Sequence, residues 1–506
     1  MLLELLLSLA VVLLIYQRWV KRDVYKLGKQ LNSGVWTLPF IGHSYLFFGD
    51  NHTRMKAFQS LGRDAISKKN NGLTSMWHGN YLYTMVADPD AAELVLKSCL
   101  EKDDIMKMAT LFLGNGSIFA PVKIWRPRRK VLAPSFSVKY LKHFMSIFVK
   151  ESNVMVDKMK SLVGTGPISA FKYFTAYTMD AVAESTLGYK MGSQKDTDQP
   201  FLKAFDEALV EGATRLCQPW LHSDLVYTNL PVYARLLKSK KFLWDFLKEL
   251  IRTKRNEMIE KVDNEEHNYN SPKGNLQTFL ESLIRLSGGD EGYTETEIVE
   301  ELMVIMIAGN DTSAVGASFI SVLLSRHPEV QEKIYKELQL VFADSDRPIT
   351  YEDLPHLKYL DAVIRETLRL YPPVPVITRK VEKDVVLPCG IKLVPGTGVI
   401  VNIWALHRNP RYWGDDVKLF RPERFLDTPL MHPAAFMPFS HGPRNCVGYQ
   451  YAMMSLKTVL STVLRRYRIL PATTPNSNSG FPPLRLKFDL MMKDEDDFQI
   501  RIESRR

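Results

Sequence analysis

The sequence predicts a mainly α-helical fold with small β-sheets, arranged as a single large domain behind a short N-terminal membrane anchor. Most of the chain beyond its first 45 residues has apolar residues at three- and four-residue steps, the period of a helix that buries one face. Its 506 residues are 45% hydrophobic and 24% charged, which is enough apolar material for a large core. No internal repeat or interdomain linker divides the chain, so we expect one domain over residues 46–506.

The N-terminal segment from Leu2 to Ile15 is almost wholly apolar, and basic residues follow it. A cleaved signal peptide, a membrane anchor and a buried helix share such a run. A signal peptide carries its charge before the run and a small-residue cleavage site after it, and this segment has neither. Basic residues after the run hold that side in the cytosol. We therefore predict an anchor over residues 1–22 in the endoplasmic reticulum membrane, followed by a stiff connector over residues 23–45.

Charge and cysteine content restrict the class of partner and the compartment. A net charge of +10 favours nucleic acid, a membrane surface or an acidic partner protein. No helix-turn-helix, zinc-finger or RNP motif is present, so we exclude nucleic acid. The cysteines form no CxxC pair, which argues against a zinc site and a disulfide framework and fits a reducing compartment. They are Cys99, Cys217, Cys389 and Cys446.

Local patterns predict the elements of the domain. Aromatic residues on both sides of Gly79-Asn80 predict a β-hairpin over Met76–Ala87. A polar, turn-rich stretch predicts a surface loop over Val262–Asn275. Helical periodicity predicts helices over Val138–Val163, Pro167–Leu187, Phe201–Leu209, Lys240–Lys261, Leu357–Leu370 and Tyr451–Tyr467.

The longest predicted helix starts at the capping box Thr294–Glu297 and ends before Pro328, because proline disfavours helix at the residue before it. Its middle is apolar nearly all round, which is typical of a buried helix. Inside that middle lies the segment Ala308-Gly309-Asn310-Asp311-Thr312. One interpretation is a helix kink in which the Thr312 hydroxyl bonds back to the Ala308 carbonyl. The other interpretation is a functional site, because polar side chains inside a buried helix are costly unless they serve a function.

A Gly/Pro-rich loop with one cysteine precedes the last predicted helix, in the stretch Phe436–Ala452. A lone cysteine is by default a small buried apolar residue. Here Cys446 meets a helix N-terminus, where backbone N–H groups and the helix dipole favour a thiolate. Arg444 adds positive charge nearby in sequence.

The spacing around this cysteine is similar to a known signature. The residues match F-x-x-G-x-R-x-C-x-G, which resembles the haem-binding signature of cytochromes P450: Phe439, Gly442, Arg444, Cys446 and Gly448. The resemblance implies that Cys446 is the thiolate ligand of haem iron, where it favours O–O cleavage. It also implies that Arg444 pairs with a haem propionate.

Other segments resemble further motifs of the same family, in the family's order. Ala308–Thr312 resembles the A-G-x-D/E-T motif of the distal helix. This implies that Ala308 leaves room for O₂ and substrate, and that Asp311 and Thr312 deliver protons to the reacting oxygen. The trio Glu366, Arg369 and Arg424 resembles the ExxR and PERF positions, which implies a structural ion cluster rather than catalysis.

Three more residues resemble propionate-binding positions of the family. Trp125 and Arg129 are four apart and so share a helical face, as in its W-x-x-x-R motif. Arg379 follows the proline-rich turn at Pro372–Pro375. A solvated arginine is the alternative interpretation for each arginine.

The chain is most similar to family 4 of the cytochromes P450, especially its insect members. The strings that carry this are Leu113-Gly-Asn-Gly and Arg365-Glu-Thr-Leu-Arg-Leu-Tyr-Pro-Pro-Val-Pro. Many family 4 members carry a glutamate that esterifies the haem where this chain has Ala308. The resemblance therefore implies haem b, held without a covalent link apart from the Cys446–iron bond.

The implied function is a haem-thiolate monooxygenase that hydroxylates or epoxidises an apolar lipid, odorant, hormone or xenobiotic. The implied electron donor is NADPH-cytochrome P450 reductase, with cytochrome b5 as a second candidate, and the implied state is a monomer. We expect the reductase to dock on Arg126, Arg128, Lys130 and Lys457. Candidate pocket residues are Phe112, Phe119, Ile305, Ala308, Val374, Val376 and Phe481. For each of them except Ala308, ordinary core is the favoured interpretation. A haem-thiolate isomerase or dehydratase and a non-catalytic haem or ligand binder are the alternatives.

Overall fold

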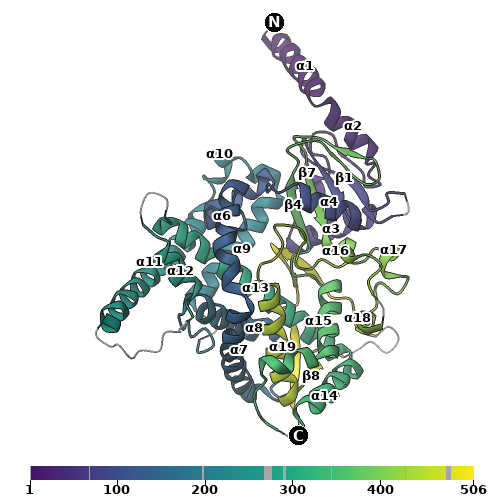
Figure 1. Cartoon of the computed structure of the whole chain (residues 1–506). Helices are drawn as coiled ribbons and strands as arrows, with labels where there is room; N and C mark the ends of the chain where they lie inside the picture. Colours follow the sequence, from purple (N-terminus) through teal and green to yellow (C-terminus); the bar gives the residue numbers. More distant parts are fainter. Residues whose placement is uncertain are drawn as a thin grey trace. The chain divides into compact units, whose positions relative to one another are not determined.

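The computed structural model describes residues 2–67, 69–196, 199–266, 276–288, 292–343, 345–427, 429–474 and 480–505. The chain forms two compact units, each assembled from segments far apart in the sequence. The first unit comprises Met1–Asp104, Val376–Val417 and Met431–Asn445. The second comprises Ile105–Pro375, Lys418–Leu430 and Cys446–Arg506. Helices predominate and the described sheets are small, as predicted (Figure 1).

The first unit is built on a four-stranded sheet of order β1-β2-β7-β4. β1 and β2 form the predicted hairpin, which pairs His78 with Tyr81 next to the turn at Gly79-Asn80. β7 runs parallel to β2 and antiparallel to β4, and a separate two-stranded ladder joins β5 to β6. The strands are β1 (Leu73–His78), β2 (Tyr81–Val86), β4 (Val376–Lys380), β5 (Val385–Val386), β6 (Lys392–Leu393) and β7 (Gly398–Asn402).

Short helices accompany this sheet. α3 packs against β1, β2 and α16, so one helix connects both ends of the unit's sequence (Figure 1). Its N-terminus is capped by the Asp50 carboxylate, which accepts from the Thr53 N–H at 2.8 Å. The helices are α1 (Leu2–Val20), α2 (Arg22–Gln30), η1 (Ser44–Phe47), α3 (Asn51–Ala65), α4 (Pro89–Ser98), α16 (Ile403–Leu406), α17 (Pro410–Trp413) and η8 (Pro433–Ala435), and η2 (Asp104–Met106) follows at the unit's edge.

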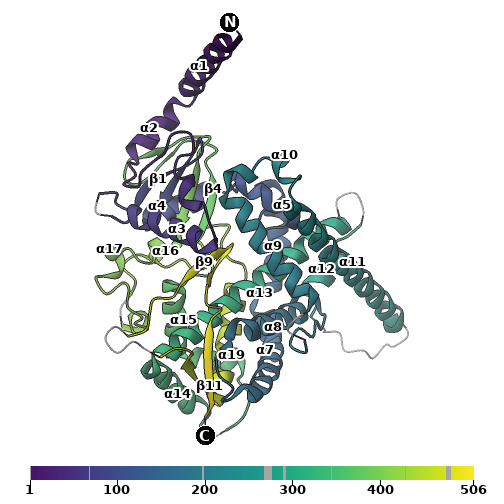
Figure 2. The ribbon, with the colours of Figure 1, turned by 180° about the vertical axis from the view of Figure 1, so that it is seen from behind.

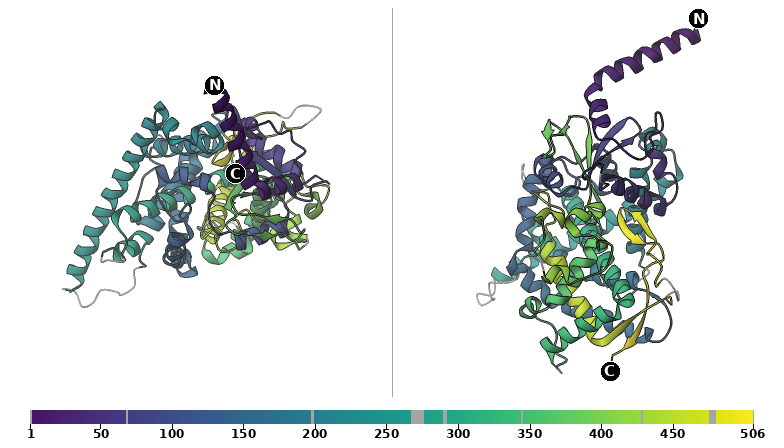
Figure 3. Two further views of the ribbon diagram at one scale, coloured as in Figure 1. Left: turned by 90° about the horizontal axis from the view of Figure 1, so that it is seen from above. Right: turned by 90° about the vertical axis from the view of Figure 1, so that its right-hand side faces the viewer.

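The predicted anchor segment is helical. Figure 3 shows α1 as one continuous helix that joins α2. Apolar side chains along it are largely exposed: Leu5, Val12, Ile15, Trp19 and Val20.

The second unit contains most of the helices and two further sheets, of order β3-β11-β8 and β9-β10 (Figure 2). Its strands are β3 (Ile168–Ser169), β8 (Tyr467–Pro471), β9 (Leu486–Asp489), β10 (Met491–Asp494) and β11 (Gln499–Ser504). Its helices are α5 (Lys107–Leu113), α6 (Val122–Leu132), η3 (Ala133–Phe136), α7 (Val138–Met159), η4 (Lys160–Leu162), α8 (Ala170–Val182), η5 (Ala183–Leu187), α9 (Pro200–Cys217), η6 (Pro219–Leu221), α10 (Asp224–Tyr227), α11 (Pro231–Glu266), α12 (Phe279–Arg285), α13 (Glu295–Arg326), α14 (Pro328–Phe342), η7 (Tyr351–His356), α15 (Lys358–Leu370), α18 (Arg424–Asp427) and α19 (Tyr449–Arg466).

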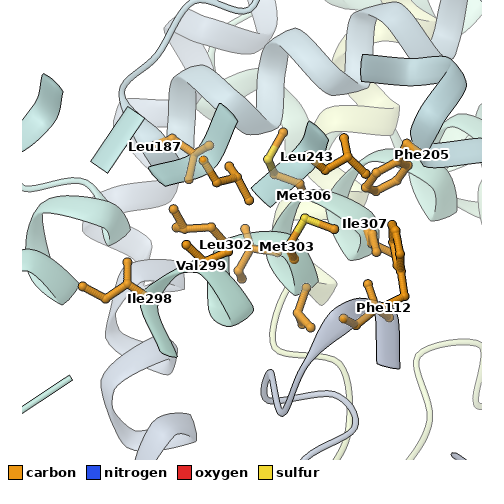
Figure 4. Close-up of a cluster of buried hydrophobic side chains, with 14 of the residues drawn as sticks. Phe112, Leu187, Phe205, Leu243, Ile298, Val299, Leu302, Met303, Met306 and Ile307 are labelled. Atoms are coloured by element: carbon orange, nitrogen blue, oxygen red, sulfur yellow. The ribbon is translucent and has the colours of Figure 1, made fainter. Parts of the chain in front are cut away.

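α13 is the centre of the second unit. It packs against α8, α15 and α19, and residues of its N-terminal half join the buried cluster of Figure 4. Among the described residues α13 alone is long and apolar enough to cross a membrane. Of its most apolar window, 83% is buried inside the protein, as expected of a core helix. The capping box at Thr294 and Glu297 and the end at Arg326 are as predicted.

Several predicted helix boundaries were wrong: α9 extends to Cys217, α11 begins at Pro231, and α7 ends at Met159. Two further differences have a clear physical reason. The predicted helix Pro167–Leu187 begins at Ala170, because Ser169 caps it with a side chain that accepts from the Lys172 N–H. Residues Val262–Glu266 of the predicted loop belong to α11. A polar sequence does not exclude a helix, since glutamate is a good helix former. Residues 267–275 of that loop lie outside the described residues.

Candidate active site

Cys446 lies in the second unit, just before α19, whose N-cap is Gly448. The residue as a whole is exposed, whereas its thiol is surrounded by protein. Burial raises the pKa of its thiol, whereas the backbone N–H of Gly448 and the positive charge of Arg129 lower it. Those two groups stabilise a thiolate, as expected of a helix N-terminus with a nearby cation.

Arg129 and Trp125 lie one turn apart on α6. Trp125 is buried and Arg129 is half-buried. Burial lowers the pKa of Arg129, and the charge of Cys446 opposes this. The structure thus brings Arg129 next to Cys446, a relationship that sequence spacing alone could not supply because the two residues are 317 positions apart (446 minus 129).

The middle of α13 differs from its flanks on one face. Ala308, Gly309 and Thr312 are half-buried, whereas Ile298–Ile307 and Ser313–Leu324 are buried. Positions i, i+1 and i+4 share a face of a helix. The Thr312 hydroxyl donates to the Ala308 carbonyl at 2.6 Å, which confirms the back-bond considered from the sequence. Its oxygen keeps lone pairs that accept from a further donor.

Asp311 points elsewhere and is buried. Its Oδ1 lies 3.2 Å from the ammonium nitrogen of Lys493 on β10, and its Oδ2 is buried without a hydrogen-bond partner. Burial raises the pKa of Asp311, and Lys493 opposes that effect. Lys493 was missed by sequence reasoning, since no motif marks it.

Gly309 has a packing role that the sequence did not reveal. A Cβ at this position would lie 2.6 Å from a methyl group of Val182 on α8. The missing side chain lets α8 and α13 approach closely at this point. Next to it, the Asn310 side chain accepts from the Thr178 hydroxyl at 2.7 Å, so Asn310 also serves the α8–α13 contact.

The first unit holds a cluster of three cations. Burial lowers the pKa of Arg379, which is 1% exposed, to about 10, and its Nε has no hydrogen-bond partner. Burial and the charge of Arg379 lower the pKa of Arg444 to about 10. The Arg444 guanidinium donates to the Leu100 carbonyl at 2.9 Å. Burial, Arg379 and Arg444 lower the pKa of Lys102 well below its usual value. The charge of Glu101 acts on Arg444 in the opposite direction, so a carboxylate of the chain partly offsets the cluster, which is suited to bind a further one. Lys102 was not predicted from the sequence.

Phe439 also lies in the first unit and is half-buried. The glycine that follows it in the signature is required by the backbone. Gly442 has φ +73°, and a Cβ there would lie 2.6 Å from the Leu96 carbonyl oxygen. The loop that carries Arg444 therefore depends on a residue without a side chain.

The predicted ion cluster forms in the second unit. Arg369 donates to Glu366 at 2.7 and 2.8 Å, and Arg424 Nε lies 3.0 Å from Glu366 Oε1. All three side chains are buried. No part of this cluster is exposed to a ligand, which fits the structural role that was predicted.

Two of the four residues predicted to dock the reductase are not exposed cations. Arg128 is buried and pairs with Glu297, Glu300 and Glu301 on α13, so it is not a surface cation. Lys457 has a 13% exposed side chain, 3.0 Å from Asp361. The sequence did not indicate the acidic partners of Arg128 and Lys457, because these partners lie on other helices. Arg126 and Lys130 are exposed.

The candidate pocket residues fall into a buried group and a group with some exposure. Three of them lie in the buried core of the second unit and are ordinary core: Phe112, Phe119 and Ile305. Val374 and Val376 are half-buried at the proline turn, and the Phe481 ring lies 5.4 Å from the Arg326 guanidinium.

A family model described as cytochrome P450 matches residues 37–491 of this chain. The chain belongs to the cytochrome P450 family. Its relatives include cytochrome P450 4V2 of Homo sapiens, 32% identical over 92% of this chain and 88% of the relative. Cytochrome P450 4d2 of Drosophila melanogaster is 32% identical over 92% and 93%, and cytochrome P450 4c21 of Blattella germanica is 30% identical over 86% and 87%.

These likenesses identify family 4 and include insect members, as the sequence motifs predicted. The family consists of haem-containing monooxygenases, so this chain is an enzyme of that class. The chain's own residues fit the haem, since Cys446 is an exposed cysteine with neighbours that stabilise a thiolate.

Proposed function

We propose that this enzyme inserts one atom of O₂ into a C–H or C=C bond of an apolar substrate, with Cys446 as the axial ligand of non-covalent haem b. The observation that carries the proposal is the environment of Cys446: an exposed residue whose thiol has the Gly448 N–H and the Arg129 charge lowering its pKa. Haem, when bound, supplies the iron at which O₂ is activated. Ala308 offers no carboxylate for a covalent link.

The remaining site residues bind, orient and move protons. Arg379, Arg444 and Lys102 neutralise one or both propionates, and so does Arg129, while Trp125 donates its indole N–H. Thr312 accepts a hydrogen bond on its hydroxyl oxygen and holds a water molecule beside Ala308. Asp311 relays protons through Oδ2, its atom without a partner: this oxygen takes up a proton and then passes it on.

The partners follow from the same proposal. Electrons come from NADPH-cytochrome P450 reductase, with cytochrome b5 as a second donor, to a monomer on the cytosolic face of the endoplasmic reticulum. The exposed apolar side chains of α1 support a location at the membrane, because they need a non-aqueous environment. Of the predicted docking residues, Arg126 and Lys130 remain as exposed cations on α6 for an acidic partner surface.

The test is product formation by the purified enzyme in membranes with reductase. Apolar compounds that shift the haem spectrum are first selected and then tested for turnover. A monooxygenase gives product only with both NADPH and O₂. An isomerase or dehydratase gives product without either, and a ligand binder gives spectral shifts without product, so both alternatives are separated in one experiment.

A further inference from the structure

Lys493 is a buried cation that connects two carboxylates of unlike exposure. It lies on β10 and its side chain is 4% exposed. Its ammonium nitrogen is 3.2 Å from Asp311 Oδ1 on α13 and 3.0 Å from Asp206 Oδ1 on α9. Asp311 is 4% exposed at its side chain, whereas Asp206 is 60% exposed. One lysine thus joins the buried acid of the proposed relay to a carboxylate in solvent.

The surroundings of Lys493 keep it charged. Burial alone disfavours the ammonium, but the carboxylates of Asp311, Asp206 and Asp489 raise its pKa. The ring of Phe171 on α8 lies 4.8 Å from the ammonium and adds a cation–π contact. A permanent cation at this place favours the ionised form of any carboxyl beside it.

Asp311 depends on that cation. A buried carboxyl without a partner takes up a proton, because its charged form loses hydration. Burial raises the pKa of Asp311, Lys493 lowers it, and the negative charge of Asp206 raises it. Only Oδ1 faces Lys493, so Oδ2 is left as the atom that exchanges a proton.

We propose that Lys493 is a positioning residue for proton delivery: it orients Asp311 through Oδ1, holds its carboxyl ionised in the resting enzyme, and couples it to the exposed carboxylate Asp206. This proposal rests on the proposed function, since it matters to catalysis only if Asp311 delivers protons. The alternative is a purely structural tether between the β9–β10 hairpin and α13. A tether would leave the coupling of NADPH use to product unchanged when Lys493 is replaced.

The first test measures protonation without turnover. Infrared spectra of the resting holoenzyme at neutral pH are compared for wild type, Lys493→Met and Lys493→Met/Asp311→Asn. We expect Lys493→Met to gain the carbonyl stretching band of a protonated carboxyl, and the double variant to lack it. Lys493→Arg, which keeps the charge, should resemble wild type. Lys254→Met is the matched control, because it removes another buried lysine, one paired with Glu257. A Lys493→Met spectrum without the band overturns the proposal.

Asp206 provides a test of opposite sign. Asp206→Asn removes a negative charge that raises the pKa of Asp311, so the variant should show no new band. Glu207→Gln, the neighbouring carboxylate that contacts Ser239, is its control. A protonated-carboxyl band in Asp206→Asn would contradict the arrangement.

The second test follows the coupling of NADPH use to product from pH 6 to 9. Lys493→Met and Asp311→Asn should both lose coupling several-fold, and Lys493→Arg should restore it. Wild-type coupling in Asp311→Asn would overturn the proton-delivery function itself. Lost coupling in Asp311→Asn together with wild-type coupling in Lys493→Met would overturn only the role of Lys493.

Discussion

Arg369 donates two hydrogen bonds to Glu366, at 2.7 and 2.8 Å, and neither side chain is exposed to solvent. Arg424 and the backbone N–H of Arg421 also donate to Glu366, at 3.0 and 2.9 Å. One carboxylate therefore balances two buried guanidinium groups. Removing one partner from a buried charge cluster is costly, because the others keep their charge without compensation.

Glu366→Gln should therefore destabilise the protein by about 3–5 kcal/mol. The measurement is chemical unfolding of the purified variant, with haem content as a second readout. Glu423→Gln is the matched control, since Glu423 is 31% exposed and pairs with Lys333. It should cost less than about 1 kcal/mol. Equal stability of the two variants would show that the cluster around Glu366 does not hold the fold.

Cys446→Ala should abolish the thiolate-type spectrum of the ferrous carbonyl complex, because the Gly448 N–H and the Arg129 charge favour the thiolate of Cys446. The measurement is the carbon monoxide difference spectrum. Cys389→Ala, at an exposed cysteine, should keep the spectrum. Survival of the spectrum in Cys446→Ala would mean that the axial ligand is another residue.

Thr312→Ala should keep haem but divert reducing equivalents to hydrogen peroxide, because the hydroxyl that holds water beside Ala308 is lost. Peroxide and product are measured against NADPH consumed. Ser318→Ala is a matched control on the same helix, since its hydroxyl makes the same kind of back-bond, to Ala314 at 2.7 Å. Unchanged coupling in Thr312→Ala would count against its role in proton delivery.

Gly309→Ala should destabilise the enzyme by about 1–3 kcal/mol, because the new methyl group would overlap Val182 and force α8 from α13. Val182→Ala in the same chain should recover most of the loss. Gly316→Ala is the control, since its nearest neighbours are 3.8 Å away. Thermal unfolding measures all three. If Val182→Ala does not restore the stability of Gly309→Ala, overlap with Val182 is not the cause of the loss.

Arg128→Met should make stability fall more steeply as pH rises. Burial raises the pKa of Glu301, and Ser117 and Arg128 oppose this. Without Arg128 that pKa rises further. A carboxyl whose folded pKa exceeds its unfolded value favours folding while protonated, and that contribution is lost as pH rises from about 4 toward the folded pKa.

The unfolding midpoint of Arg128→Met should therefore drop relative to wild type between about pH 5 and pH 7. Arg128→Met/Glu301→Gln should lose part of this dependence. Arg126→Met, on the exposed side of the same helix, should follow the wild-type curve. A parallel curve for Arg128→Met would show that Glu301 stays ionised without its partner.

The sequence was sufficient to predict those elements whose formation depends on residues close together in the chain. The capping box at Thr294, the hairpin turn at Gly79-Asn80 and the stop before Pro328 depend on neighbouring residues alone, and each was predicted correctly. Helix ends failed where a single side chain decides, as at Ser169, or where polar residues continue a helix, as in α11.

The site was predictable only as far as motifs reach. Cys446, Asp311 and Thr312 come from recognisable patterns, whereas Lys102 and Lys493 are isolated lysines in the sequence. Their importance comes from tertiary neighbours, Arg379 and Arg444 for Lys102 and Asp311 for Lys493. Arg128 failed for the same reason, since its three glutamates lie about 170 residues away along the chain.

The loop before α6 has little freedom to vary. Ser117 donates its N–H and hydroxyl to Glu301, and Arg128 donates to the Asn115 carbonyl. A side chain at Gly114 would overlap Glu300, and one at Gly116 would overlap Val304. Substitutions in this loop therefore cannot be accepted without loss of these contacts, so divergence within the family has to occur at other positions of the chain.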